Sequence, residues 1–293
     1  MSSNLKKSSS MEPFIAEPTK LHTHTFILLH GLGSNGEKFG QELLNTAMTS
    51  GGARLQSLLP HAKFIFPSAR KRRSSAFNHS LLTQWFDIAS LNDLSIRQDV
   101  QYQGLAESAK TIRALIDNES QNVPLGNIIL GGLSQGYAMS LSVLLSLDCS
   151  LGGFLGMSGW LPFQQEVAQL IAEEGEHGDK DDPFKEEESR GWVADHPMTT
   201  AANFYRELLS IDTSDTDLEH TALLTPVFIG HGKADPKVPI HLSESAAQTL
   251  RRIGIDVTWR PYAEHGHWYK VPDEVDDIMD FLEKKTNATI VKS

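Results

Sequence analysis

Short apolar runs alternate along the chain with longer segments whose apolar residues recur at helical spacing. The short runs occupy residues 24–31, 62–69, 127–132, 152–159, 225–232 and 256–262. Several of them are almost continuously apolar, as is expected of strands that are covered on both faces. We therefore predict strands at these six places.

Apolar stripes with the period of an α-helix occur in residues 97–117, 240–253 and 273–283. In the first of these segments, for example, Leu105 and Ile112 lie two turns apart on one face. A chain in which strands and helices alternate builds βαβ units around a parallel sheet. The predicted fold class is therefore α/β, with a mostly parallel central sheet flanked by helices.

One long segment breaks this alternation and defines the expected domain organisation. Residues 163–200 begin with an apolar helical pattern, and residues 173–190 within them hold nine acidic side chains against three basic ones. A long insertion in a compact domain is usually either disordered or a functional lid. We expect a partly helical, lid-like insertion with a mobile acidic middle. It would lie within a single domain of residues 21–293 that follows a disordered tail of residues 1–20.

Composition narrows the classes of function. The net charge of −11 argues against general affinity for nucleic acid. No apolar run approaches the roughly 18 residues needed to span a bilayer, and the polar N-terminus lacks the apolar region of a signal peptide. The single cysteine, Cys149, excludes an internal disulfide framework and fits a reducing compartment. We expect a cytoplasmic protein, and the basic run from Arg70 to Arg73, although typical of a solvated loop, adds the nucleus as a lesser expectation.

The segment NIILGGLSQGYAMSL, residues 127–141, runs from an apolar strand through a serine between glycines into a helical pattern. Gly132, Ser134 and Gly136 fit G-x-S-x-G, the nucleophile elbow, in which a sharp strand-to-helix turn exposes the serine oxygen at the carboxyl edge of the sheet. Glycines at this spacing relieve crowding around the strained turn. An ordinary turn is the alternative, but the sequence on both sides favours a nucleophile at Ser134.

A serine nucleophile needs a histidine base and a carboxylate that orients the base, and in this architecture the acid and then the histidine follow the serine in the chain. Asp235 comes directly after an apolar strand, whereas Asp256 opens a strand and so lies at the wrong end. His265 and His267 both lie in the loop after the last strand, so either is a candidate base. His231 is better suited to order the loop that carries Asp235. Two histidines without further ligands give no more than weak support for a metal, and no metal is expected.

The glycine-rich stretch after the first predicted strand fits an oxyanion hole. In His30-Gly31-Leu32-Gly33 the glycines let the backbone approach a reacting carbonyl, and the N–H of Leu32 is the natural donor beside that of Gln135. A nucleotide-binding loop is the alternative, but the spacing is not G-x-G-x-x-G and no phosphate-binding lysine pattern follows. The sequence therefore predicts a serine hydrolase.

Six motifs in register make the chain resemble the acyl-protein thioesterase and carboxylesterase/phospholipase family of α/β-hydrolases, most closely its fungal members. They are LLHGLGSNGEKF, TQWFDI, GLSQGYAMSL, SGWLP, GHGKADPKVP and GHWYKVPDE. The resemblance runs from about residue 24 to 283 and omits the insertion. It implies an α/β-hydrolase fold and a reaction without cofactor or metal.

The resemblance also assigns roles to residues. It places the family's nucleophile on Ser134, its acid on Asp235 and its histidine on His267. The oxyanion donors fall on Leu32 and Gln135, as the loop pattern independently predicts. Trp85 and Trp160 are implied to border the acyl site, although each tryptophan taken alone is more often a core residue. Tyr137 stands where the family commonly has a small residue, so it either narrows the acyl channel or packs against the helix without affecting the chemistry.

The implied substrates are fatty acyl thioesters on palmitoylated proteins, which adds transient contact with membrane surfaces as an expectation. The first alternative is a general carboxylesterase or lysophospholipase with the same three side chains. A catalytically silent hydrolase fold used as a binding module is a remote alternative, because the serine, acid, histidine and oxyanion loop are all present.

Overall fold

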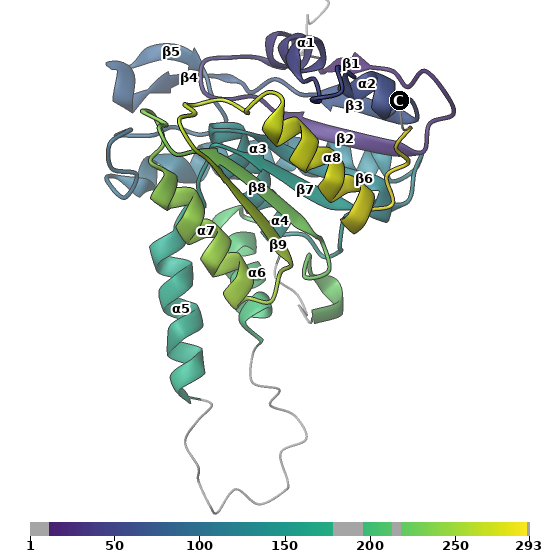
Figure 1. The fold of residues 1–293 in the computed structure, drawn as a ribbon. Helices are drawn as coiled ribbons and strands as arrows, with labels where there is room; N and C mark the ends of the chain where they lie inside the picture. Colours follow the sequence, from purple (N-terminus) through teal and green to yellow (C-terminus); the bar gives the residue numbers. More distant parts are fainter. Residues whose placement is uncertain (1–11, 178–195, 213–217, 292–293) are drawn as a thin grey trace, which may run out of the picture.

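A seven-stranded sheet forms the centre of the molecule in a computed structural model that describes residues 12–177, 196–212 and 218–291 (Figure 1). The strand order is β1-β3-β2-β6-β7-β8-β9, and every neighbouring pair is parallel except β1 with β3. The strands are β1 (Phe14–Ala16), β2 (His24–Leu29), β3 (Ala62–Phe66), β6 (Ile128–Leu133), β7 (Gly153–Met157), β8 (Val227–Gly232) and β9 (Val257–Tyr262). The predicted α/β fold with a mostly parallel sheet is therefore confirmed.

Helices cover both faces of the sheet, because successive residues of each buried strand point to opposite sides. On β2, Ile27 and Leu29 belong to the apolar cluster of one face, whereas Phe26 and Leu28 belong to that of the other. The first cluster is covered by α3 (Tyr102–Glu119), α4 (Gln135–Leu145), α5 (Gln164–His177), α6 (Pro197–Leu208) and α7 (Ile240–Arg252). The second is covered by α1 (Gly36–Thr46), α2 (Leu55–Leu58) and α8 (Asp273–Lys285).

The prediction of a disordered tail over residues 1–20 is wrong for residues 12–20, the part that the structure describes. Phe14 to Ala16 form β1, which pairs antiparallel with β3, and the ring of Phe14 packs on Phe66 at a centroid distance of 5.9 Å. The apolar side chains and the free edge of β3 together stabilise this short strand, which the polar surroundings of the sequence conceal. Residues 1–11 lie outside the described residues.

A two-stranded hairpin lies apart from the central sheet. Its strands are β4 (Lys71–Ser74) and β5 (Ser80–Thr83), joined through a short 3-10 helix (Ser75–Phe77). The basic run, which the sequence suggests is a loop, is thus largely a strand, and Arg72 in it donates to Glu107 of α3 at 2.9 Å. The N–H of Gly33 donates to the carbonyl of Thr83 at 2.8 Å, which ties the hairpin to the loop after β2.

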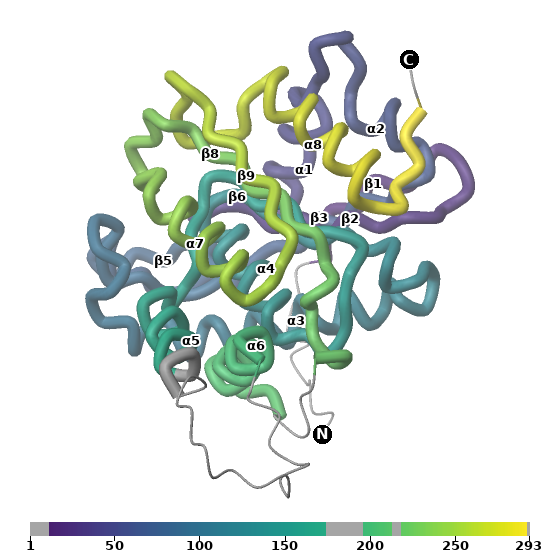
Figure 2. The backbone as a smooth tube through the Cα atoms, turned by 60° about the horizontal axis from the view of Figure 1, so that its bottom comes forward, coloured from purple at the N-terminus to yellow at the C-terminus, as the bar shows by residue number. Residues whose placement is uncertain are grey.

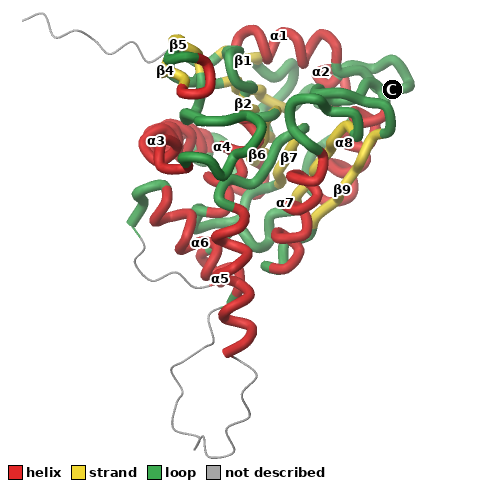
Figure 3. Tube along the Cα trace, turned by 90° about the vertical axis from the view of Figure 1, so that its left-hand side faces the viewer, coloured by secondary structure: helices red, strands yellow, loops and turns green. Residues whose placement is uncertain are grey.

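The insertion begins with α5 and ends with α6, which lie side by side (Figure 2). The C-terminal part of α5 extends away from the rest of the described structure (Figure 3). Residues 178–195, which include most of the acidic segment 173–190, lie outside the described residues. The expected mobility of that segment therefore stays a prediction. No helix in the described part of the chain has the length and apolar content required to cross a bilayer.

Candidate active site

Ser134 occupies a strained turn between β6 and α4. Its backbone angles, φ 57° and ψ −120°, lie in a region that non-glycine residues rarely adopt. Glycine is required on both sides, because a Cβ on Gly136 would lie 2.2 Å from the carbonyl oxygen of Leu29 and one on Gly132 would lie 2.5 Å from the backbone of Gly136. The turn thus presents the serine oxygen at the carboxyl edge of the sheet, as the motif predicts.

The structure brings Ser134, His267 and Asp235 together from three separate loops. Nε2 of His267 lies 2.9 Å from Oγ of Ser134, and Nδ1 lies 2.7 Å from Oδ2 of Asp235. Asp235 follows β8 and His267 follows β9, and these parallel strands end at the same edge of the sheet as β6. The imidazole is therefore placed to take a proton from the serine while the carboxylate fixes its tautomer.

Asp235 is held ionised by the groups around it. Burial by itself raises the pKa of Asp235, but hydrogen bonds from His231 and His267 outweigh this effect and hold the pKa well below its usual range. The backbone N–H groups of Lys237 and Val238 also donate to Oδ1, at 2.8 and 3.1 Å. A carboxylate with this many donors stays ionised and is placed to stabilise a protonated His267.

His265, the alternative base, points elsewhere. Its Nε2 lies 2.9 Å from the carbonyl oxygen of Trp268, and its own carbonyl accepts from the N–H of Ala234 at 2.9 Å. A Cβ on Gly232 would lie 2.3 Å from that carbonyl, so the loops after β8 and β9 pack against each other at this point. His265 holds the loop that carries His267, and it does not contact Ser134.

The loop after β2 lies beside the serine. A Cβ on Gly31 would lie 3.4 Å from Cβ of Ser134, and Leu32 and Gln135 both line the cavity in front of the serine. Their backbone N–H groups find no acceptor within the described residues. Two unpaired N–H groups at a serine are the arrangement that an oxyanion hole requires.

His30 supports this loop, a role that the sequence interpretation missed. Its Nε2 accepts from the N–H of Ala69 at 3.0 Å, so Nδ1 carries the proton that is donated to the carbonyl of Gly31 at 2.8 Å. Burial lowers the pKa of His30 to about 4, which keeps the ring neutral. The signal that could have revealed it is a histidine directly before the glycines of the loop.

Trp85 is not part of the cavity wall, which corrects the expectation for this residue. Its side chain is buried, and Nε1 donates to the carbonyl of His30 at 2.8 Å. Its backbone N–H donates to the side chain of Gln135 at 3.0 Å, so Trp85 joins the two halves of the oxyanion site from behind. Trp160 does line the cavity, as the resemblance implies.

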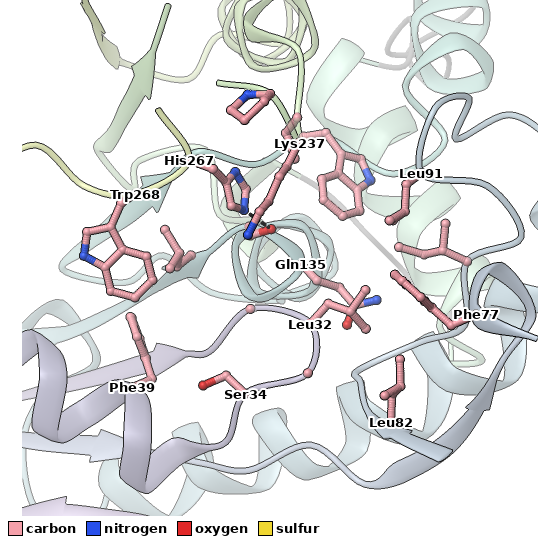
Figure 4. Close-up of a pocket in the computed structure, with 18 of the residues that line it drawn as sticks. Leu32, Ser34, Phe39, Phe77, Leu82, Leu91, Gln135, Lys237, His267 and Trp268 are labelled. Carbon is pink, nitrogen blue, oxygen red and sulfur yellow. Dashed lines mark hydrogen bonds between the residues drawn. The ribbon is translucent and has the colours of Figure 1, made fainter. Parts of the chain in front are cut away.

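A cavity of about 500 Å³ opens in front of Ser134 (Figure 4). Apolar side chains dominate its wall, and Lys237 is the one lysine, arginine or acidic residue that lines it in the described part of the chain. The apolar side chains are Leu32, Phe39, Phe77, Leu82, Ile88, Leu91, Leu133, Trp160, Val238 and Trp268. No described residue of the insertion lines this cavity, so the expected lid is not formed by α5 or α6 as described.

Tyr137 does not narrow the cavity. Its side chain is fully buried, and a Cβ on Gly159 would lie 2.4 Å from its ring, so it packs between α4 and the chain that follows β7. Burial raises the pKa of its phenol far above the ordinary value.

As for metals, no group of three or more His, Cys, Asp or Glu side chains that could hold one occurs among the residues placed in the structure.

Comparisons with known proteins place the chain among hydrolases. A family model described as phospholipase/carboxylesterase matches residues 11–182, and one described as prolyl oligopeptidase family matches residues 174–289. Acyl-protein thioesterase 1 of Gibberella zeae is 29% identical over 95% of this chain and 97% of its own length. The protein of the same name from Yarrowia lipolytica is 34% identical over 53% of this chain and 65% of its own length. Acyl-protein thioesterase 2 of Zea mays superposes with a TM-score of 0.63 at 23% identity and covers 94% of this chain and 98% of its own.

Proposed function

The chain belongs to the phospholipase/carboxylesterase family of hydrolases, and we propose that it cleaves fatty acyl thioesters from S-acylated proteins with Ser134 as the nucleophile. The observation that carries the proposal is the hydrogen-bonded series from Ser134 through His267 to Asp235 at an apolar cavity. The relatives named acyl-protein thioesterase support the substrate class.

The reaction follows from the positions of these groups. His267 takes the proton of Ser134 while the serine oxygen attacks the thioester carbonyl, and the developing negative charge on the carbonyl oxygen is met by the N–H groups of Leu32 and Gln135. His267 then protonates the departing cysteine thiolate. Water, deprotonated by the same imidazole, releases the fatty acid from the acyl-enzyme.

The cavity suits an acyl chain. A volume of about 500 Å³ lies within the range of roughly 300–1,000 Å³ that is usual for small-molecule sites. Each methylene group removed from water stabilises binding by about 0.8 kcal/mol. The protein part of the substrate is too large to enter, so it must lie across the mouth of the cavity.

A general carboxylesterase or lysophospholipase is the alternative function. The observation in its favour is that the described residues lining the cavity include no group that would distinguish an oxygen ester from a thioester. A specificity profile that compares an S-palmitoyl peptide with lysophosphatidylcholine and short aryl esters separates the two functions.

The expected cytoplasmic location, with a nuclear fraction, stays a prediction that microscopy of the tagged full chain tests.

The proposal is tested with Ser134→Ala and an S-palmitoyl peptide whose freed thiol is measured. We expect hydrolysis to fall to the level of the uncatalysed reaction and labelling by a fluorophosphonate to disappear, because both need the serine oxygen. Ser57→Ala, at an exposed position of α2, is the matched control and should keep both activities. Undiminished turnover by the Ser134→Ala protein would end the proposal.

A further inference from the structure

Lys237 places a single positive charge at the mouth of a cavity whose wall is mostly apolar. Its side chain is exposed, points into the cavity in the direction of His267 (Figure 4), and has no acidic partner among the described residues. No acidic side chain of the described chain lines the cavity with it. An ammonium group that is neither paired nor needed for the proposed reaction is available to a charged group of the substrate.

The backbone around Lys237 is fixed. Its N–H donates to Oδ1 of Asp235 at 2.8 Å, and prolines stand at 236 and 239. Proline locks one of the two soft backbone angles of its residue. The position of the lysine relative to the Asp235 and His267 pair is therefore set by the same contacts that set the proposed catalytic geometry.

Lys237 lies on the leaving-group side of the cavity. His267 must protonate the departing thiolate, so the leaving group lies next to this imidazole. In Figure 4 Lys237 extends beside His267, whereas Leu82, Leu91 and Phe77 lie on another side of the cavity and suit the acyl chain. The charge thus meets the part of the substrate that carries the sulfur.

We propose that Lys237 selects S-acylated peptides that carry a carboxylate within about two residues of the acylated cysteine. This inference rests on the proposed thioesterase function. A peptide is favoured over a lipid headgroup as the bearer of the anion, because the ammonium is exposed at the mouth, where a leaving group too large for the cavity must lie. The protein's net charge of −11 repels acidic peptides in general, so the attraction acts locally, within the Debye length of about 8 Å at physiological ionic strength.

The experiment compares three S-palmitoyl peptides of one sequence. The first has Glu next to the cysteine and an amidated C-terminus, the second has Gln in place of that Glu, and the third has Gln with a free C-terminal carboxylate one residue away. We expect the protein to prefer the Glu peptide over the Gln peptide by about fivefold in kcat/KM at low salt, the effect of one exposed ion pair. The third peptide should also be preferred over the second, because its C-terminal carboxylate lies within the same reach; equal turnover of these two peptides would contradict the inference. High salt should reduce the preference.

Lys237→Met keeps the apolar stem of the side chain and removes the charge. We expect it to bring the ratio of the two kcat/KM values, Glu peptide over Gln peptide, from about fivefold to near one, whatever it does to the overall rate. Lys237→Glu should reverse the preference. Lys233→Met is the matched control, because Lys233 is exposed on the same loop but does not line the cavity; this variant should retain the wild-type preference.

Three failures are distinguishable. If the wild-type protein turns over the Glu and Gln peptides equally, the thioesterase function stands and the inference about Lys237 is overturned. If it turns over none of the peptides although a fluorophosphonate labels Ser134, the proposed function fails and the inference falls with it. A Lys237→Met effect on lysophosphatidic acid relative to monoacylglycerol, without an effect on the peptides, would also overturn it and assign the lysine to a phosphate headgroup.

Discussion

His231 lies 3.1 Å, through Nε2, from Oδ2 of Asp235, the carboxylate oxygen that also pairs with His267. The same Nε2 lies 2.9 Å from the carbonyl oxygen of Val238, and Nδ1 lies 2.7 Å from Oγ of Ser243. His231 is completely buried, so these contacts fix its ring and through it the carboxylate. A second histidine, His231, thus helps to hold the carboxylate of Asp235. This agrees with the interpretation of the sequence, in which His231 orders the loop that carries Asp235.

Loss of His231 should therefore lower kcat more than it raises KM. In His231→Gln one donor to Asp235 is lost or displaced, and a hydrogen bond to a charged group contributes about 1.5–3 kcal/mol. We expect kcat on an aryl ester to fall about tenfold or more, with KM nearly unchanged, because His231 does not line the cavity. His241→Gln, at an exposed position of α7, is the control. An equal effect of the two substitutions on kcat would contradict the role of His231.

Substitutions of the two histidines in the loop after β9 should have clearly different effects on activity. We expect His267→Ala to abolish hydrolysis, because no other side chain among the described residues hydrogen-bonds to Oγ of Ser134. His265→Ala should leave most of the activity, because His265 contacts the carbonyl of Trp268 and not the serine. Steady-state rates with an aryl ester measure both. The opposite ranking would mean that the wrong imidazole has been assigned as the base.

The two tryptophans should affect different kinetic constants. Trp160→Ala enlarges the cavity wall and should raise KM most for long acyl chains, whereas Trp85→Phe removes the N–H that supports the carbonyl of His30 and should lower kcat for every chain length. A series of acyl thioesters of increasing length measures this. If Trp85→Phe changed the preference for chain length, the placement of Trp85 behind the wall would be refuted.

These tryptophans also show how far the sequence carries the argument. The strands and the order of serine, acid and histidine follow from apolar periodicity and from a motif whose glycines have a steric cause. Trp85 and Trp160 look alike in sequence, and only the packing around each ring decides which one reaches the cavity. Local pattern does not contain that information.

Two strands that the sequence interpretation missed, β1 and β4, share one cause. β1 is three residues long, and β4 in the hairpin is basic, so neither presents the apolar run that identifies a buried strand. Both depend on partners distant in sequence: Phe14 on Phe66, and Arg72 on Glu107. Long-range pairing of this kind overrides local propensity.

Glu274 gives a pH dependence of stability that can be assigned to one residue. Its side chain is fully buried at the start of α8, where Oε2 accepts from the N–H of Lys270 at 2.9 Å and Oε1 has no partner. Burial raises the pKa of Glu274 to about 8, and the negative charge of Asp277 adds to this rise. Glu274 is therefore protonated at neutral pH in the folded protein, whereas in the unfolded chain it is ionised above roughly pH 4.3.

The sign of the effect follows from these two pKa values. Below about pH 4 Glu274 is protonated in both the folded and the unfolded state, so its ionisation does not lower the free energy of unfolding. As the pH rises towards 8 the unfolded state ionises and the folded state cannot follow, so the stability contributed at low pH is progressively lost. Glu274→Gln keeps an acceptor for the N–H of Lys270 and does not titrate. Relative to the wild-type protein it should therefore gain stability between pH 5 and 9, on the order of a few kcal/mol.

Urea midpoints of both proteins at pH 5 and pH 9 measure this difference. Asp273→Asn is the control on the same helix, because Asp273 is half exposed and pairs with Lys270, so its difference from the wild-type protein should stay nearly constant between pH 5 and 9. The loop from His267 to Lys270 leads directly into α8, so activity should decline together with stability on the alkaline side in the wild-type protein and less so in Glu274→Gln. A stability difference between Glu274→Gln and the wild-type protein that is the same at both pH values would show that Glu274 does not hold its proton in the folded state.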